Sequence, residues 1–222
     1  MNSTAPTTSA STSVTRFLQS SSVPPLVAIL RGLVPQDSVD IGKALYGAGF
    51  RILEVPLNRP GALECIASLV QHLPADVLVG GGTMLSMADV DAVHAAGGRM
   101  LVSPNCDVAV IRHAVSLGML AAPGVATPTE AFTALHAGAH ALKFFPAEMV
   151  GHGGLKAMKS VLPSGTLLWP VGGITPTSMA AWLQAGATGF GIGSQLYAPG
   201  SSASEVQTRA VGYLQAWRAA GV

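Results

Sequence analysis

The chain has 222 residues, of which 49% are apolar and only 10% are charged, and its formal net charge is +1. A nearly neutral chain without a run of basic residues gives no support to nucleic-acid binding, and no apolar stretch approaches the roughly 18 residues of a membrane span. We therefore expect neither a nucleic-acid nor a membrane partner. The two cysteines, Cys65 and Cys106, have no metal-binding or redox spacing and indicate reduced thiols in a cytoplasmic protein.

The N-terminal residues differ in composition from the rest of the chain. Residues 1–22 are rich in serine and threonine, with one arginine and no acidic residue. We expect a disordered leader that continues into a short helix around residues 14–19, although a transit peptide can have a similar composition. Residues 23–222 are long enough for one domain with a full core.

From Pro25 onward, short apolar runs alternate with segments of helical spacing. Strands are predicted over residues 26–30, 51–57, 77–82, 99–104, 119–123, 141–146, 167–171 and 189–193. Helix starts are indicated by capping residues or an early proline at Pro35, Ser86, Asp107, Thr127 and Thr175-Pro176. Glycines suited to helix ends follow at Gly49, Gly97, Gly118, Gly138 and Gly186.

Eight strand–helix units predict an α/β fold of one domain, a (β/α)₈ TIM barrel preceded by the short N-terminal helix. A doubly wound open sheet uses the same elements, but it usually has a glycine-rich phosphate turn after its first strand. No such turn follows residues 26–30. The barrel is therefore the favoured fold.

Lys143 stands inside the apolar run of residues 141–146, which predicts a buried strand. The other three lysines, Lys43, Lys156 and Lys159, fall in segments predicted as solvated helices. Burial disfavours a charged ammonium, and a neutral amine attacks carbonyl carbon well, which is the first requirement of Schiff-base chemistry. The alternative is a lysine at a strand end whose amine extends to solvent.

Glu54 is a second charged residue within a predicted strand. Alone, it could be an ion-pair partner of Arg31 or Arg51. Side-chain alternation along both strands, however, allows Glu54 and Lys143 to point into one barrel interior. A carboxylate beside an imine-forming amine suits the proton transfers that such chemistry needs.

Glycine-rich segments end the last two predicted strands, at Gly172-Gly173 and at Gly193-Ser194. The corresponding loops of (β/α)₈ barrels commonly hold a phosphate group. Backbone amides can approach a ligand closely at these glycines, and the predicted helix start at Thr175-Pro176 would supply further donors. The sequence therefore predicts a phosphorylated sugar or sugar acid as the small-molecule ligand.

A divalent-metal aldolase is an alternative, because such enzymes also use barrels. All the histidines except His152 fall in predicted helices or at their ends, and a helix end separates His136 from His140. We therefore expect no metal and no other cofactor. Glu148, which follows the sixth predicted strand, is expected to be a solvated loop acid, although it could touch the site.

Several motifs resemble those of the 2-keto-3-deoxy-6-phosphogluconate/galactonate aldolase family of class I aldolases. The resemblance covers the chain from Pro25 to about Gln195. Its most specific segments are Glu54-Val55-Pro56-Leu57-Asn58, Gly81-Gly82-Thr83, Ser103-Pro104-Asn105, Lys143-Phe144-Phe145-Pro146 and Val171-Gly172-Gly173-Ile174-Thr175.

This resemblance implies a role for each of these positions. Lys143 would form the Schiff base, and Glu54 would be the general acid/base acting through a water. Arg31, Thr83, Pro104 and Phe145 would bind the substrate, with Thr83 on the pyruvoyl carboxylate and Arg31 on an acidic end. Gly172, Gly173, Gly193 and Ser194 would bind the phosphate. The resemblance further implies a homotrimer.

Within that family, two features favour the phosphogalactonate branch. The first strand ends in Arg31-Gly32, which resembles the phosphogalactonate enzymes. Asn58 stands at a position where the phosphogluconate enzymes have an arginine in common. The Phe-Phe-Pro-Ala-Glu segment ending at Glu148 is closer to the phosphogluconate enzymes. A phosphogluconate or 4-hydroxy-2-oxoglutarate aldolase, a non-catalytic sugar-phosphate-binding barrel and an imine-free synthase or isomerase remain alternatives.

Overall fold

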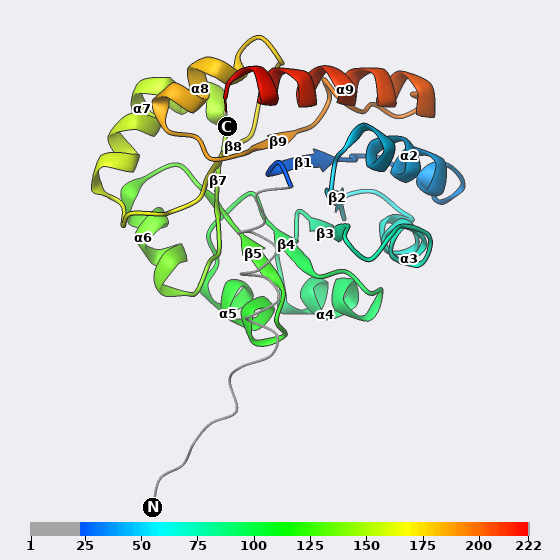
Figure 1. Cartoon of the computed structure of the whole chain (residues 1–222). Helices are drawn as coiled ribbons and strands as arrows, with labels where there is room; N and C mark the ends of the chain where they lie inside the picture. The colour runs from blue at the N-terminus through cyan, green and yellow to red at the C-terminus, as the bar shows by residue number, and fades with distance from the viewer. Residues whose placement is uncertain (1–22, 222) are drawn as a thin grey trace, which may run out of the picture.

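The computed structural model describes residues 23–221, so the predicted leader and N-terminal helix lie outside the described residues. Parallel strands form the centre of the molecule and helices surround them (Figure 1). The strands are β1 (Leu26–Ile29), β2 (Ile52–Pro56), β3 (Leu78–Gly82), β4 (Met100–Val102), β5 (Leu120–Ala122), β6 (Gly124–Val125), β7 (Leu142–Phe144), β8 (Leu168–Pro170) and β9 (Phe190–Ile192).

Eight helices in the described part of the chain follow the strands. They are α2 (Pro35–Ala48), α3 (Ala62–His72), α4 (Met87–Ala95), α5 (Val108–Ser116), α6 (Pro128–His136), α7 (Ala147–Val161), α8 (Met179–Ala185) and α9 (Ala203–Ala219). Between residues 23 and 221, no helix combines the length and apolarity that crossing a bilayer requires.

The strands close into a ring. One sheet has the order β5-β4-β3-β2-β1-β9 and the other has the order β6-β7-β8. Only Pro123 separates β5 from β6, and a parallel bridge between Val171 and Gly191 joins the end of β8 to β9. The helix α9 packs against α2, so the last helix lies beside the first described one (Figure 1). The predicted (β/α)₈ barrel is confirmed.

The local sequence signals are also largely confirmed. Ser86 and Thr127 form capping boxes with Asp89 and Glu130, and Asp107 caps α5. The five predicted helix-ending glycines all have positive φ, as left-handed helix ends require.

Two boundaries differ from the prediction. The fifth strand is split at Pro123, which has no N–H for the strand ladder. The prediction that a helix starts at Thr175-Pro176 is wrong, because α8 begins at Met179. Residues 175–178 instead form a turn in which the Thr175 N–H donates to Ser178 Oγ and the Ser178 N–H donates to Thr175 Oγ1.

Side-chain alternation divides the apolar core into two layers. The outer layer joins strand residues such as Leu53 and Phe144 to residues of the surrounding helices. The inner layer consists of residues of the strands and their ends: Val27, Ile29, Ile52, Met100, Val102, Leu120, Ala122, Ala141, Trp169 and Val171. Glu54 and Lys143 alternate with Ile52 and Ala141, so both face the inside of the barrel.

Candidate active site

Lys143 and Glu54 are both buried, and each is the middle residue of its strand. Lys143 in β7 is 7% exposed, and Glu54 in β2 is 2% exposed. The other three lysines lie on α2 and α7 with exposed side chains, as predicted. Lys143 is thus distinguished from every other amine side chain of the protein by its burial in the barrel.

The positive charges of Lys143 and Arg31 both act on the Glu54 carboxyl group. Burial raises the pKa of the Glu54 carboxyl above its usual value of 4.5, and the positive charges of Lys143 and Arg31 partly oppose this rise. Arg51 is not a partner of Glu54, because its guanidinium forms an ion pair with Asp76 at 2.9 Å and lies over the Tyr46 ring. Glu54 therefore belongs with Lys143 and Arg31, and burial raises its pKa in the direction that favours a proton-transferring carboxyl group.

The end of β3 forms one wall beside Glu54. A Cβ on Gly82 would overlap the Oε1 atom of Glu54, so the carboxylate occupies the space that a larger residue would need. The next residue, Thr83, has a φ of 54°. A β-branched residue rarely adopts this left-handed conformation, and such strain gathers at functional sites.

Phe145 and Pro104 lie close to Lys143 and to its ladder partner. The Lys143 Nζ atom is 5.0 Å from the centroid of the Phe145 ring, within the range of a cation–π contact. Gly124 pairs with Lys143 in the ladder between β6 and β7. A Cβ on Gly124 would overlap the carbonyl of Pro104, so the loop after β4 packs tightly beside the lysine strand.

A cavity of about 350 Å³ opens at the carboxyl ends of β1, β7, β8 and β9. Six of the predicted site residues line it: Arg31, Phe145, Gly172, Gly173, Gly193 and Ser194. The cavity thereby brings together the predicted phosphate-binding glycines and serine. Glu148, Gln195 and Tyr197 also line the cavity. Gln195 and Tyr197 were missed by sequence reasoning, although their position directly after the last strand was an available signal.

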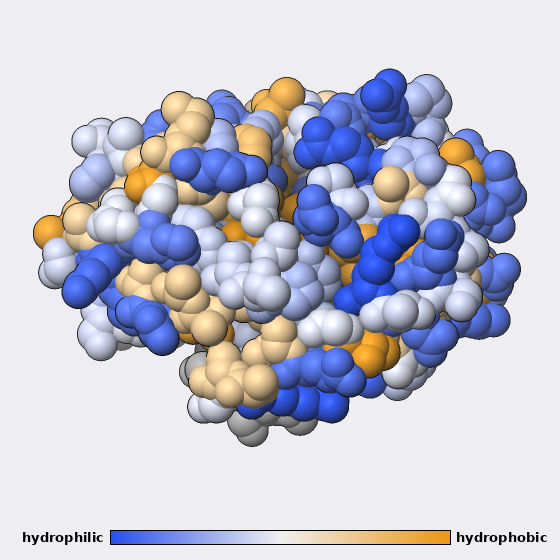
Figure 2. All heavy atoms as spheres, turned by 90° about the horizontal axis from the view of Figure 1, so that it is seen from above, coloured by the Kyte–Doolittle hydropathy of each residue, from blue (hydrophilic) through white to orange (hydrophobic). Residues whose placement is uncertain are grey.

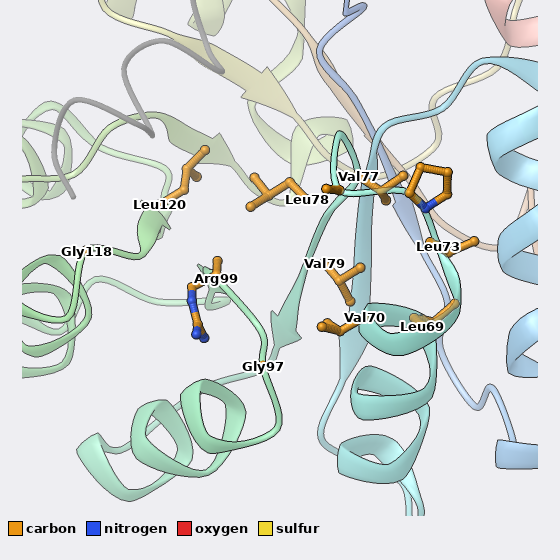
Figure 3. Close-up of a pocket in the computed structure, with 12 residues that line it drawn as sticks. Leu69, Val70, Leu73, Val77, Leu78, Val79, Gly97, Arg99, Gly118 and Leu120 are labelled. Carbon is orange, nitrogen blue, oxygen red and sulfur yellow. The ribbon is translucent and has the colours of Figure 1, made fainter. Parts of the chain in front are cut away.

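A second pocket, of about 440 Å³, lies at the opposite end of the barrel (Figure 3). Its walls come from the C-terminal end of α3 and from the beginnings of β3, β4 and β5, and they are mostly apolar. Arg99 lines it, but its guanidinium donates to the carbonyls of His94 and Gly98. No predicted site residue lies here, and the chemistry of such barrels belongs to the other end.

Metal-binding groups do not gather anywhere between residues 23 and 221. No group of three or more His, Cys, Asp or Glu residues in this range could hold a metal ion. His152 was the one histidine that the sequence did not predict to be in or near a helix, but it lies within α7. Its ring centroid is 4.1 Å from that of Trp182.

The fold and the site together define a (β/α)₈ barrel with a buried lysine–glutamate pair beside a glycine-lined cavity. Comparison with known proteins agrees with this class. Residues 18–210 match the family model described as "Aldolase: KDPG and KHG aldolase". The chain therefore belongs to the KDPG and KHG aldolase family and is a lyase.

Two curated relatives are similar over most of their length. The chain is 45% identical over 195 residues to a probable 2-dehydro-3-deoxy-6-phosphogalactonate aldolase of Rhizobium meliloti (strain 1021), covering 88% of this chain and 92% of the relative. It is 44% identical over 196 residues to the 2-dehydro-3-deoxy-6-phosphogalactonate aldolase of Escherichia coli (strain K12), covering 88% and 96%. A solved structure titled "Native KDPGal structure" has a TM-score of 0.87 at 44% identity, covering 89% of this chain and 96% of that one.

The contact between Gly82 and Glu54 leads to a first prediction. In Gly82→Ala, the added methyl group meets the Glu54 carboxylate and displaces it, and a displacement of about 1 Å at a catalytic group can lower the rate by about 10²-fold. Aldol cleavage should therefore fall by at least about this factor. The matched control is Gly153→Ala, because a Cβ on Gly153 meets nothing within 4 Å. Equal loss of activity in the two variants would contradict the role of Gly82.

Proposed function

We propose that the protein is a class I aldolase that cleaves 2-dehydro-3-deoxy-6-phosphogalactonate to pyruvate and D-glyceraldehyde 3-phosphate. The observation that supports this most directly is the burial of Lys143 and Glu54 inside one barrel, with the charge of Lys143 acting on the Glu54 carboxyl. The phosphogalactonate aldolases that are 45% and 44% identical to the chain support the choice of substrate.

Substrate binding, in this proposal, uses the two ends of the site. Gly172, Gly173, Gly193 and Ser194 bind the phosphate through backbone amides and a hydroxyl, since all four line the cavity. At the other end, Thr83 binds the pyruvoyl carboxylate. Arg31, which lines the cavity and whose charge also acts on Glu54, binds an acidic group of the substrate. Pro104 and Phe145 hold the reacting carbon atoms against the Lys143 amine.

Cleavage begins with an imine. The neutral Lys143 amine attacks the C2 carbonyl. The resulting carbinolamine takes up a proton and loses water, which gives a protonated imine that accepts an electron pair. Glu54, acting through a water, removes the proton of the C4 hydroxyl. The C3–C4 bond then breaks, and D-glyceraldehyde 3-phosphate leaves. The two electrons of the broken bond form an enamine on the lysine. Protonation at C3 and hydrolysis release pyruvate and restore the amine, and no metal or cofactor is needed.

The family resemblance supports a proposal for the assembly and the cellular role. We propose a cytoplasmic homotrimer that acts in carbohydrate metabolism, in galactonate breakdown of the De Ley–Doudoroff type, which parallels the Entner–Doudoroff route of gluconate. Polar residues cover much of the face seen in Figure 2, and strongly apolar residues are confined to small areas there.

The lysine chemistry is tested by borohydride reduction in the presence of pyruvate, followed by intact mass and peptide mapping. We expect a reduced pyruvyl adduct on Lys143 and on no other lysine. Lys143→Ala should form no adduct and have no measurable turnover, because the imine is the electron sink. Lys156→Ala is the control, since this lysine is exposed on α7. Substantial activity in Lys143→Ala would refute the role of Lys143. No adduct on folded wild-type protein would leave a sugar-phosphate binder or an imine-free synthase.

Glu54→Gln tests the proton transfer. The ionised carboxylate acts as the base in cleavage, and the pKa of Glu54 is raised by burial, so wild-type activity should fall as the pH decreases through this raised pKa. In Glu54→Gln, this acidic limb of the kcat/KM profile should disappear, and the rate at neutral pH should fall by roughly 10²–10⁴-fold. An unchanged rate and profile would refute the role.

The stereochemical preference at C4 is tested by comparing two substrates. The purified enzyme should cleave 2-dehydro-3-deoxy-6-phosphogalactonate with a higher kcat/KM than the gluconate epimer, measured by coupled detection of pyruvate. 4-Hydroxy-2-oxoglutarate, which lacks the phosphate, serves as a third substrate. A preference for the gluconate epimer would assign the protein to the phosphogluconate branch of the same family.

A further inference from the structure

Glu148 has a carboxylate that lies directly on the proposed phosphate loop. The residue is in the first turn of α7, five positions after Lys143, and it lines the 350 Å³ cavity. A Cβ on Gly173 would come within 3.0 Å of Glu148 Oε1, and a Cβ on Gly172 would overlap Oε2. The carboxylate thus fills the space that two consecutive glycines leave without side chains.

The charge of Glu148 is unexpected at this position. Arg31 and Glu148 are the two charged residues among those that line the cavity. An acidic residue in a first helical turn stabilises the helix, and this alone would account for its presence on α7. It does not account for the side chain lying across Gly172 and Gly173, where the carboxylate would repel a bound phosphate.

Nothing in the described part of the chain fixes the Glu148 side chain in this place. Neither a hydrogen bond nor an ion pair to its carboxylate occurs between residues 23 and 221. The side chain is also largely exposed to solvent. An incoming anion can therefore displace the carboxylate by rotation of the side chain, without breaking a fixed contact.

We propose that the Glu148 carboxylate is an internal anion that competes with inorganic phosphate, and with the phosphate group of the substrate, for the Gly172–Gly173 loop. This inference rests on the proposed function, because it concerns the phosphate end of the same site. The carboxylate weakens the binding of both ligands to the loop by a similar factor. Free phosphate gains only the contacts of this loop, so its binding becomes weak. The complete substrate also gains the contacts of its pyruvoyl end and the bond to Lys143, so it still binds.

Calorimetric titration with inorganic phosphate, in a buffer without other polyvalent anions, tests the proposal. Glu148→Gln keeps the size of the side chain and removes its charge, and we expect it to bind phosphate about three- to tenfold more tightly than the wild type. Glu148→Ala removes both charge and volume and should change the affinity in the same direction. The control is Glu64→Gln, because Glu64 is also an exposed first-turn glutamate but belongs to α3, outside this cavity.

Three results would overturn the proposal. Unchanged affinity in both Glu148 variants would show that the carboxylate does not compete, and weaker affinity would show that Glu148 helps to hold the phosphate. An equal gain in Glu64→Gln would indicate a general effect of net charge. The failure of the proposed function is distinguishable from these results, because the absence of a pyruvyl adduct on wild-type Lys143 does not alter the phosphate titrations.

Discussion

The enclosure of one amine and one carboxyl group within an apolar barrel is the constraint on which the rest of the site depends. Removing Lys143 and Glu54 from water is costly, and burial of either group in its charged form without a partner would cost several kcal/mol. The strand register makes the arrangement possible. Glu54 lies opposite Ile29 of β1 and Gly80 of β3, and Lys143 lies opposite Gly124 and Trp169. A slip of one residue in either strand would turn the charged side chain outward against the helices.

Glycine next to each buried ion allows the neighbouring segment to approach closely. The space that a side chain on Gly80 would need is taken by Met100, and that of Gly124 is taken by the carbonyl of Pro104. At Gly80 the strand β4, and at Gly124 the loop after β4, therefore pack closely beside Glu54 and Lys143, and no channel opens there. This close approach limits the water around Lys143 and Glu54, which strengthens their mutual electrostatic effect.

The sequence predicted the barrel because its signals are local. Strand alternation, capping residues such as Ser86 and glycines such as Gly49 act within a few neighbouring residues. The same alternation was sufficient to direct Lys143 and Glu54 inward. Features that leave no periodic signal were not predictable in this way. The left-handed backbone of Thr83 is one of them. The turn that delays α8 to Met179 is another, because it is held by hydrogen bonds between Thr175 and Ser178, residue types that also suit a helix start.

Glu148 illustrates this limit at the site itself. Its sequence position, shortly after the lysine strand, favoured a solvated loop acid and left a residue of the cavity as the alternative. Which of the two it is depends on Gly172 and Gly173, about 25 residues further along the chain, because the Glu148 carboxylate lies in the space that side chains at these glycines would occupy. Since Arg31 is the one cation that lines the cavity, phosphate binding in the proposed function relies mainly on backbone amides. In a site with so little positive charge, the repulsion of a single carboxylate is enough to weaken the binding of a phosphate group to this loop.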